Sequence, residues 1–158
     1  MGETREVRLH IDVPADVLWA MVTDLPRMGE WSPENEGGEW LDGATGPVVG
    51  ARFKGRNRRG KTAWPTTIEV EVAEPGREFQ FLVGGRKPTT RWRYRFLPDA
   101  GGAGTEVVES FDLVKPLSRA ERLVTRATIG VKDREADMED GMRQTLARLK
   151  EAAEAPPS

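Results

Sequence analysis

Six short segments of alternating apolar and polar residues follow one another through the middle of the chain. They are Glu39–Leu41, Ala51–Asn57, Thr66–Ala73, Glu78–Val83, Thr90–Leu97 and Thr105–Val114. A period of two is the pattern of a half-buried β-strand. The links between the segments are short and rich in glycine, proline and aspartate, which form tight turns. The segments therefore predict an antiparallel meander, since parallel strands would need long crossover connections.

Helical patterns flank the predicted meander. Before it, VRLHIDV predicts one more strand, PADVLWAMVTDL predicts a helix, and PRMGEWSPENEGG predicts a short turn or a second small helix. After Pro116 the chain is rich in helix formers, and Ser118 with Glu121 forms a capping-box pattern at the start of a long terminal helix. Gly130 is placed to bend or interrupt this helix. One apolar stripe is predicted along it, formed by Leu123, Val124, Ala127, Met138, Met142, Leu146 and Leu149.

This order of elements is that of an α+β helix-grip fold, in which a curved antiparallel sheet wraps around a long C-terminal helix and a pocket lies between them. The chain has 158 residues, which is the size of one domain. We expect a single domain over residues 1–154 and a disordered tail over residues 155–158.

Four segments resemble a known family. DVPADVLWAMVTDLPRMGEWSP, the hairpin that begins GARFKGRNRRG, WRYRFLP with its glycine-rich turn, and GTEVVESFDL are similar to the bacterial polyketide cyclase/dehydrase-like branch of the SRPBCC (START-like) superfamily. The similarity runs from about Arg5 to Ala153. It implies the helix-grip fold, but the superfamily includes cyclases, hydratases, lipid carriers, hormone receptors and cochaperones, so it does not choose among these functions.

The segment Thr90–Phe96, TRWRYRF, alternates three aromatic residues with three arginines. Either the aromatic rings stack on nucleic-acid bases while the arginines hold phosphates, or the two sets face opposite sides of a strand. The chain has 24 Lys and Arg against 26 Asp and Glu, a formal net charge of -2, so it lacks the basic excess of a dedicated nucleic-acid binder. We expect the arginines to face water. Their predicted acidic neighbours across the sheet are Glu69, Glu71, Glu106 and Asp112.

The hairpin Arg52–Lys61 is the strongest argument for an anionic partner, because it carries six basic residues. An interaction module that uses this basic convex face therefore stays open as a third alternative. We expect the hairpin to be a solvated surface and no nucleic acid to be a partner.

The inward-facing positions of the predicted strands are mostly apolar or aromatic, with a few polar groups among them, which is the composition of a small-molecule pocket. The candidate ligand-binding residues are Asn57, Trp64, Thr66, Phe81, Trp92, Tyr94, Glu109, Met138 and Met142. Trp31 and Trp40 are expected at the pocket mouth. In the alternative, the polar groups satisfy one another and Trp64 and Trp92 fill the cavity.

Catalytic chemistry has few candidates in this chain. The cysteine count is 0 and the single histidine, His10, falls on the polar side of its strand, so a histidine triad, a cysteine nucleophile or a cysteine-zinc site has no residues to build from. We find no metal, nucleotide or flavin motif and expect no cofactor. Glu109 and Tyr94 remain as candidate catalytic residues, because a carboxyl group buried among aromatic rings can act as a general acid or base near neutral pH. A buried glutamate that accepts a tyrosine hydrogen bond is also explained as a satisfied polar group.

The sequence predicts a protein that binds a small hydrophobic or aromatic molecule between the sheet and the terminal helix. The alternative is a polyketide cyclase/dehydrase-type enzyme that uses a pocket carboxylate. No apolar run approaches the length of a membrane span and the N-terminal residues lack a signal-peptide pattern, so we expect a cytoplasmic protein. We expect it to be a monomer or a homodimer. The ligand itself cannot be named from the sequence.

Overall fold

The computed structural model describes residues 4–114, 118–129 and 134–155. In chain order the elements are β1 (Arg5–Ile11), α1 (Ala15–Thr23), the 3-10 helix η1 (Leu25–Glu30), β2 (Asn35–Trp40), β3 (Arg52–Arg59), β4 (Thr62–Glu74), β5 (Glu78–Val83), β6 (Thr90–Pro98), β7 (Thr105–Leu113), α2 (Arg119–Ile129) and α3 (Arg134–Glu154). The strands of these ranges form one sheet in the order β1-β7-β6-β5-β4-β3-β2. Every neighbouring pair in it is antiparallel.

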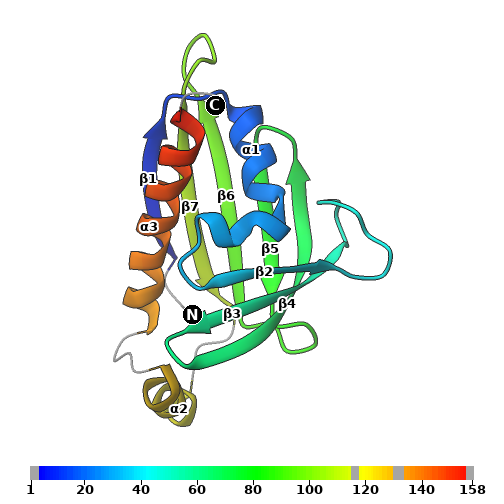
Figure 1. The fold of residues 1–158 in the computed structure, drawn as a ribbon, viewed down its shortest axis with the longest axis vertical. Helices are drawn as coiled ribbons and strands as arrows, with labels where there is room; N and C mark the ends of the chain where they lie inside the picture. Colours follow the sequence, from blue (N-terminus) through cyan, green and yellow to red (C-terminus); the bar gives the residue numbers. More distant parts are fainter. Residues whose placement is uncertain (1–3, 115–117, 130–133, 156–158) are drawn as a thin grey trace.

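The sheet curves around α3, as the helix-grip prediction requires (Figure 1). From β2 to β7 the strands pair in sequence order, which is the usual arrangement of consecutive antiparallel strands. β1 closes the far side by pairing with β7, where Val7 lies opposite Glu109. α3 packs against β1 and β7, while α1 contacts β5 and β6 on the same side of the sheet. The predicted α+β helix-grip architecture is confirmed.

The strands are longer than the alternating pattern indicated in two places. β4 begins at Thr62, so the hairpin link after β3 is reduced to Gly60 and Lys61. β2 begins at Asn35 and carries an irregularity in its pairing between Asn35 and Gly38. Because glycine has no side chain, this strand shows no clear alternation of apolar and polar residues. Gly38 is required at its position, because a Cβ there would lie 2.1 Å from the carbonyl oxygen of Lys54.

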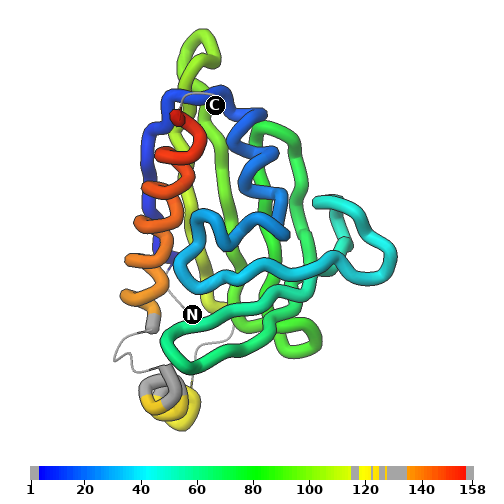
Figure 2. The backbone as a smooth tube through the Cα atoms, viewed as in Figure 1, coloured from blue at the N-terminus to red at the C-terminus, as the bar shows by residue number. Residues whose placement is uncertain are grey.

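The terminal helical region consists of α2 and α3, and Gly130 lies outside the described residues between them. The predicted cap at Ser118 is confirmed, since its Oγ accepts a hydrogen bond from the backbone N–H of Glu121 at 3.2 Å. The prediction of one continuous apolar stripe is wrong for its first half. Leu123 and Val124 on α2 are 68% and 59% exposed, because α2 lies beyond the end of the sheet, where no strand covers it (Figures 1 and 2).

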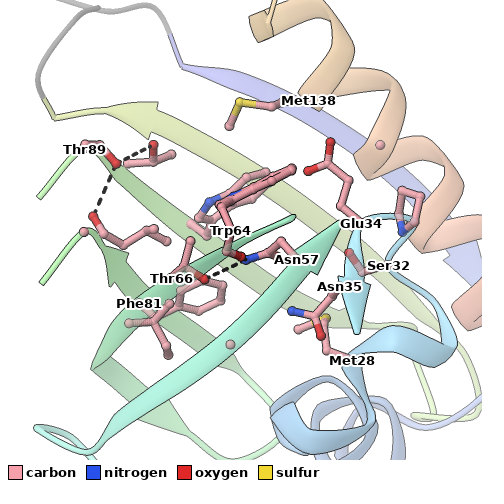
Figure 3. A pocket seen from close by; sticks show the side chains of 18 of the residues that line it. Met28, Ser32, Glu34, Asn35, Asn57, Trp64, Thr66, Phe81, Thr89 and Met138 are labelled. Atoms are coloured by element: carbon pink, nitrogen blue, oxygen red, sulfur yellow. Dashed lines mark hydrogen bonds between the residues drawn. The ribbon is translucent and has the colours of Figure 1, made fainter. Parts of the chain in front are cut away.

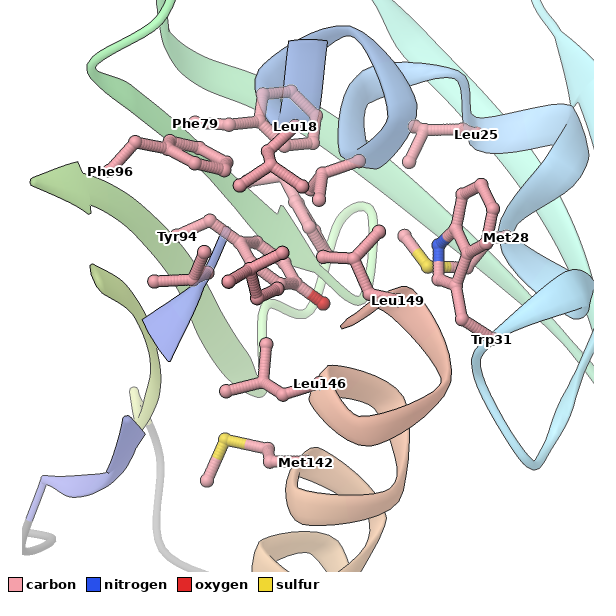
Figure 4. Close-up of a cluster of buried hydrophobic side chains, with 14 of the residues drawn as sticks. Leu18, Leu25, Met28, Trp31, Phe79, Tyr94, Phe96, Met142, Leu146 and Leu149 are labelled. Carbon is pink, nitrogen blue, oxygen red and sulfur yellow. The ribbon is translucent and has the colours of Figure 1, made fainter. Parts of the chain in front are cut away.

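The hydrophobic core lies between α1, η1, the sheet and the C-terminal half of α3 (Figure 4). Leu18, Phe79, Leu146 and Leu149 are among its fully buried side chains. Because this half of α3 is fixed against packed side chains, the N-terminal half of the helix is held over the other end of the curved sheet. That end is where the cavity lies.

Candidate functional site

A cavity of about 1200 Å³ lies between the curved sheet and the N-terminal half of α3. Its walls come from β3 to β7, from the segment after η1 and from the first turns of α3 (Figure 3). The volume slightly exceeds the usual range for small-molecule sites, about 300–1,000 Å³. It leaves room for a ligand of several rings.

All nine residues that the sequence predicted for the pocket line this one cavity. They are Asn57, Trp64, Thr66, Phe81, Trp92, Tyr94, Glu109, Met138 and Met142. Seven of them come from strands, where alternation alone decides which side chains face the helix. Trp64 and Trp92 are among the residues that line the cavity, and about 1200 Å³ remains open. The alternative in which these two indoles fill the space is therefore wrong.

The two tryptophans expected at the pocket mouth do not lie there. Trp31, which follows the 3-10 helix, is 1% exposed and belongs to the hydrophobic core. Trp40 packs edge-on against Phe53, with ring centroids 5.2 Å apart, and is not part of the cavity lining. Trp31 follows the short helix η1 and Trp40 ends the short strand β2, and neither element is long enough for its pattern to predict the direction of the indole.

Other lining residues were missed by the sequence analysis. Ser32, Glu34 and Asn35 come from the segment after η1, and Arg86 and Thr89 come from the link between β5 and β6. None of these positions belongs to an alternating or helical pattern, so no periodic signal could have found them. In Figure 3, Ser32, Glu34 and Asn35 lie on one side of the cavity and Thr89 lies on the other.

The deep end of the cavity holds a buried polar pair. The Tyr94 hydroxyl donates a hydrogen bond to Oε2 of Glu109 at 2.7 Å, and the two residues are 3% and 2% exposed. They meet because β6 and β7 pair with Tyr94 directly opposite Glu109. Figure 4 shows the hydroxyl directed toward α3, near Leu146 and Leu149. The other oxygen of the carboxyl group, Oε1, has no hydrogen-bond partner among the described residues.

Burial controls the protonation of this pair. Loss of solvation raises the pKa of Glu109 from 4.5 to about 8, although the hydrogen bond from Tyr94 acts in the opposite direction. Burial also raises the pKa of the Tyr94 hydroxyl well above 10, and the neighbouring Glu109 charge adds to that effect. At pH 7 both groups are therefore mainly neutral. A neutral carboxyl group in this position can donate a proton or a hydrogen bond.

A second polar pair lies on the sheet wall. Nδ2 of Asn57 donates to Oγ1 of Thr66 at 3.0 Å and to the carbonyl oxygen of Trp64 at 3.3 Å (Figure 3). Both amide hydrogens are used within the hairpin of β3 and β4. Asn57 therefore offers a ligand its Oδ1 atom, which is an acceptor.

Charged side chains link the elements at the cavity rim. Nη1 of Arg59 donates to Oδ2 of Asp137 on α3, and it lies 3.4 Å from Oε1 of Glu34. The Asp137 hydrogen bond is the main cause that raises the pKa of Arg59. The hairpin Arg52–Lys61 is therefore not a uniform solvated surface. Its last arginine ties the hairpin to the start of α3.

The outward arginines of β6 pair with acidic residues on the convex face. Arg91 bonds Glu71 at 2.7 Å, as predicted from the alternation. The other two arginines take partners that the sequence analysis did not name: Arg93 lies 3.1 Å from Glu78 and Arg95 lies 2.9 Å from Glu6. The two faces of TRWRYRF thus differ as expected, with Tyr94 and Phe96 buried on the side of α3.

The described residues offer few other functional groups. His10 is exposed on the outer face of β1, where its Nε2 lies 2.8 Å from Oδ2 of Asp99. Within residues 4–114, 118–129 and 134–155, no group of three or more His, Cys, Asp or Glu side chains is arranged to hold a metal ion. No helix in the same ranges is both long and apolar enough to cross a membrane.

Comparison with known proteins gives the same architecture. The sequence profile of a family described as polyketide cyclase/dehydrase and lipid transport matches residues 4–154. A search of curated proteins gave no match.

Among solved structures, a polyketide-cyclase-like protein from Corynebacterium glutamicum is 32% identical, with 98% of this chain and 86% of that chain covered and a TM-score of 0.54. The Zhui aromatase/cyclase from Streptomyces sp. R1128 is 16% identical, with 98% and 94% covered and a TM-score of 0.72. A START superfamily protein from Mycobacterium smegmatis is 13% identical, with 96% and 99% covered and a TM-score of 0.69. The last two share the fold with this chain.

Proposed function

The chain belongs to the polyketide cyclase/dehydrase and lipid transport family, and we propose that it binds a small hydrophobic or aromatic molecule in the cavity between the sheet and α3. The observation that carries this proposal is an open cavity of about 1200 Å³ with aromatic walls and few polar groups. Family membership supports a hydrophobic ligand, but it does not identify one.

The chemistry of the walls favours a flat, largely apolar ligand. Trp64, Phe81 and Trp92 line the cavity, and contacts with aromatic rings favour an aromatic ligand over an aliphatic one of equal size. Met138 and Met142 cover the cavity from α3 with unbranched, polarisable side chains that adapt to different ligand outlines. Two polar pairs at different depths are enough to orient such a ligand.

The test is a fluorescence titration with 2-naphthol as the probe. Trp64 and Trp92 line the cavity, so binding should change tryptophan emission, and the change should be reduced in the double variant Trp64→Phe, Trp92→Phe. Gly141→Phe places a ring in the cavity, because the nearest atom that a Cβ at Gly141 would meet is Cγ of Pro33 at 3.9 Å.

The matched control for the filled cavity is Ala147→Phe, which adds the same ring at an exposed position of α3. We expect Gly141→Phe to abolish binding and Ala147→Phe to leave it intact. Equal binding by both variants would place the probe outside the cavity and contradict the proposal.

A second candidate function is a cyclase-type enzyme in which Glu109 transfers a proton. The specific observation in its favour is the pKa of about 8 that burial gives this carboxyl group, which suits general acid or base chemistry near neutral pH. Because the group is mainly protonated at pH 7, it would begin the reaction as an acid. Tyr94 would then hold the carboxylate that forms, through the existing hydrogen bond of 2.7 Å.

The variant Glu109→Gln separates the two functions, since it keeps the shape of the side chain and removes its proton chemistry. With a linear poly-β-ketone thioester as substrate and product analysis by mass spectrometry, an enzyme should keep binding and lose about 10²–10⁴ in turnover. A binding protein should convert none of the thioester with either form. Unchanged turnover in the variant would exclude Glu109 as the proton-transferring group.

The ion pairs of β6 argue against the third alternative, an interaction module on the basic convex face. The arginines of β6 are paired with Glu71, Glu78 and Glu6, so these charges are locally balanced. Phosphate contacts would have to compete with existing ion pairs.

A further inference from the structure

We propose that the deep end of the cavity selects ligands that carry an uncharged hydrogen-bond acceptor, such as a ketone or quinone oxygen, and that Glu109 binds this oxygen as a neutral donor. The inference rests on the proposed binding function. It adds the chemical class of the ligand. It also states that the end of the ligand that carries the acceptor oxygen enters the cavity first.

We place the proton of neutral Glu109 on Oε1. With the Tyr94 hydroxyl donating its one hydrogen to Oε2, at 2.7 Å, Oε2 acts as the acceptor. The carboxyl proton then lies on Oε1. Oε1 has no partner among the described residues, which leaves a buried O–H donor without an acceptor.

An unpaired buried donor of this kind is uncommon and costs the folded protein free energy. Because Glu109 lines the cavity, a ligand oxygen is a partner that can remove that cost. Less than 1 Å² of Oε1 is exposed to solvent, so the ligand oxygen must displace a covering side chain. Met142 lies one turn from Leu146 on α3, lines the cavity, and has the flexible side chain that such a displacement needs.

The groups around Glu109 keep it neutral. Its direct neighbours in the sheet are Val7 on β1 and Tyr94 on β6. Arg5, two residues along β1 from Val7, is paired with α3, at 2.8 Å from Glu139 and 3.8 Å from Glu135.

The remaining acidic groups near the start of α3 are Asp137, which is paired with Arg59 at the rim, and Asp140, which is paired with Arg143. Desolvation and the Tyr94 hydrogen bond are the causes that set the pKa of Glu109 at about 8, with no contribution from a cation. A carboxyl group kept neutral by an apolar site is able to donate a hydrogen bond at pH 7. Ionised Glu109 would instead repel an acceptor oxygen.

The experiment compares three probes of similar shape: 2-acetylnaphthalene, which carries a neutral acceptor, 2-isopropylnaphthalene, which has none, and 2-naphthoate, which is an anion. Affinities are measured by calorimetry at pH 6.5 and pH 9.5. At pH 6.5 we expect the ketone to bind about two- to tenfold more tightly than the hydrocarbon, the factor given by one net hydrogen bond. At pH 9.5 this preference should disappear, because Glu109 is ionised above a pKa of about 8.

Two variants identify Glu109 as the donor. Glu109→Gln keeps a neutral N–H donor, so its preference for the ketone should persist at both pH values. Glu109→Leu has no donor, so it should bind the ketone and the hydrocarbon equally at both. In wild-type protein, an equal affinity for the two probes at pH 6.5, or a preference unchanged at pH 9.5, would overturn the inference. Stronger binding of 2-naphthoate than of the ketone at pH 9.5 would also overturn it.

These outcomes are distinct from failure of the proposed function. If no probe binds, or if Gly141→Phe binds all of them as well as wild type does, the cavity is not a ligand site. If all three bind in the cavity without discrimination, the cavity is a ligand site and the assignment of its deep end is wrong.

Discussion

Burial of Glu109 should make the stability of the protein fall as pH rises between about 5 and 8. The carboxyl group has a pKa of about 8 in the folded protein and an ordinary value of 4.5 when it is exposed to water. Between these two values the unfolded chain has lost this proton while the folded protein still holds it. Unfolding therefore releases a proton, and a higher pH favours the unfolded state.

The magnitude follows from the separation of the two pKa values. From 4.5 to about 8 is about 3.5 pH units, and each unit corresponds to about 1.4 kcal/mol. The contribution of Glu109 should thus fall by about 5 kcal/mol over this range and change little above pH 8. A loss of this size is comparable to the whole stability of a marginal domain.

Urea denaturation followed by tryptophan fluorescence measures the effect, with Glu109→Gln as the control because it cannot ionise. The difference in unfolding free energy, wild type minus variant, should fall by about 1.4 kcal/mol per pH unit from pH 5 to 8. Surface carboxylates contribute equally to both proteins, so they cancel in this difference.

A difference that stays constant across this range would refute the argument, because it would show that Glu109 has the same pKa in the folded and unfolded states. Tyr94→Phe provides a further check. The hydrogen bond from Tyr94 lowers the pKa of Glu109, so its removal should move the end of the slope to a higher pH.

Further outcomes are expected elsewhere in the molecule. Leu146→Ala should cost about 2–5 kcal/mol in urea melts because the side chain is 1% exposed, whereas Leu123→Ala, at a position 68% exposed, should cost less than about 0.5 kcal/mol. Fluorescence anisotropy with single- and double-stranded oligonucleotides should show little binding at low or moderate salt; tight, salt-sensitive binding that is abolished by Arg56→Glu would instead support a nucleic-acid partner. Gly38→Ala should destabilise the pairing of β2 with β3, since the added Cβ would lie 2.1 Å from the carbonyl oxygen of Lys54, and loss of amide-exchange protection in these two strands would show it.

Much of the site could be predicted because it lies on strands. Alternation fixes the face of each side chain, so Trp92, Tyr94 and Glu109 could be assigned to the same side before their neighbours were known. The same argument failed in loops. The segment around Trp31 and Glu34 has no helical or alternating period, so its pattern did not predict that Trp31 enters the core and that Glu34 reaches the cavity rim.

The sequence by itself determined the succession of strands, the inward face of each and the position of the terminal helix, because these properties depend on residues close together in the chain. The tertiary structure decided that the space under α3 stays open and that Arg59 reaches Asp137. It also placed Tyr94 opposite Glu109, through the pairing register of β6 and β7. These features depend on sheet curvature and strand register, which bring together residues far apart in the chain. Neither can be predicted from the local periodicity of the sequence.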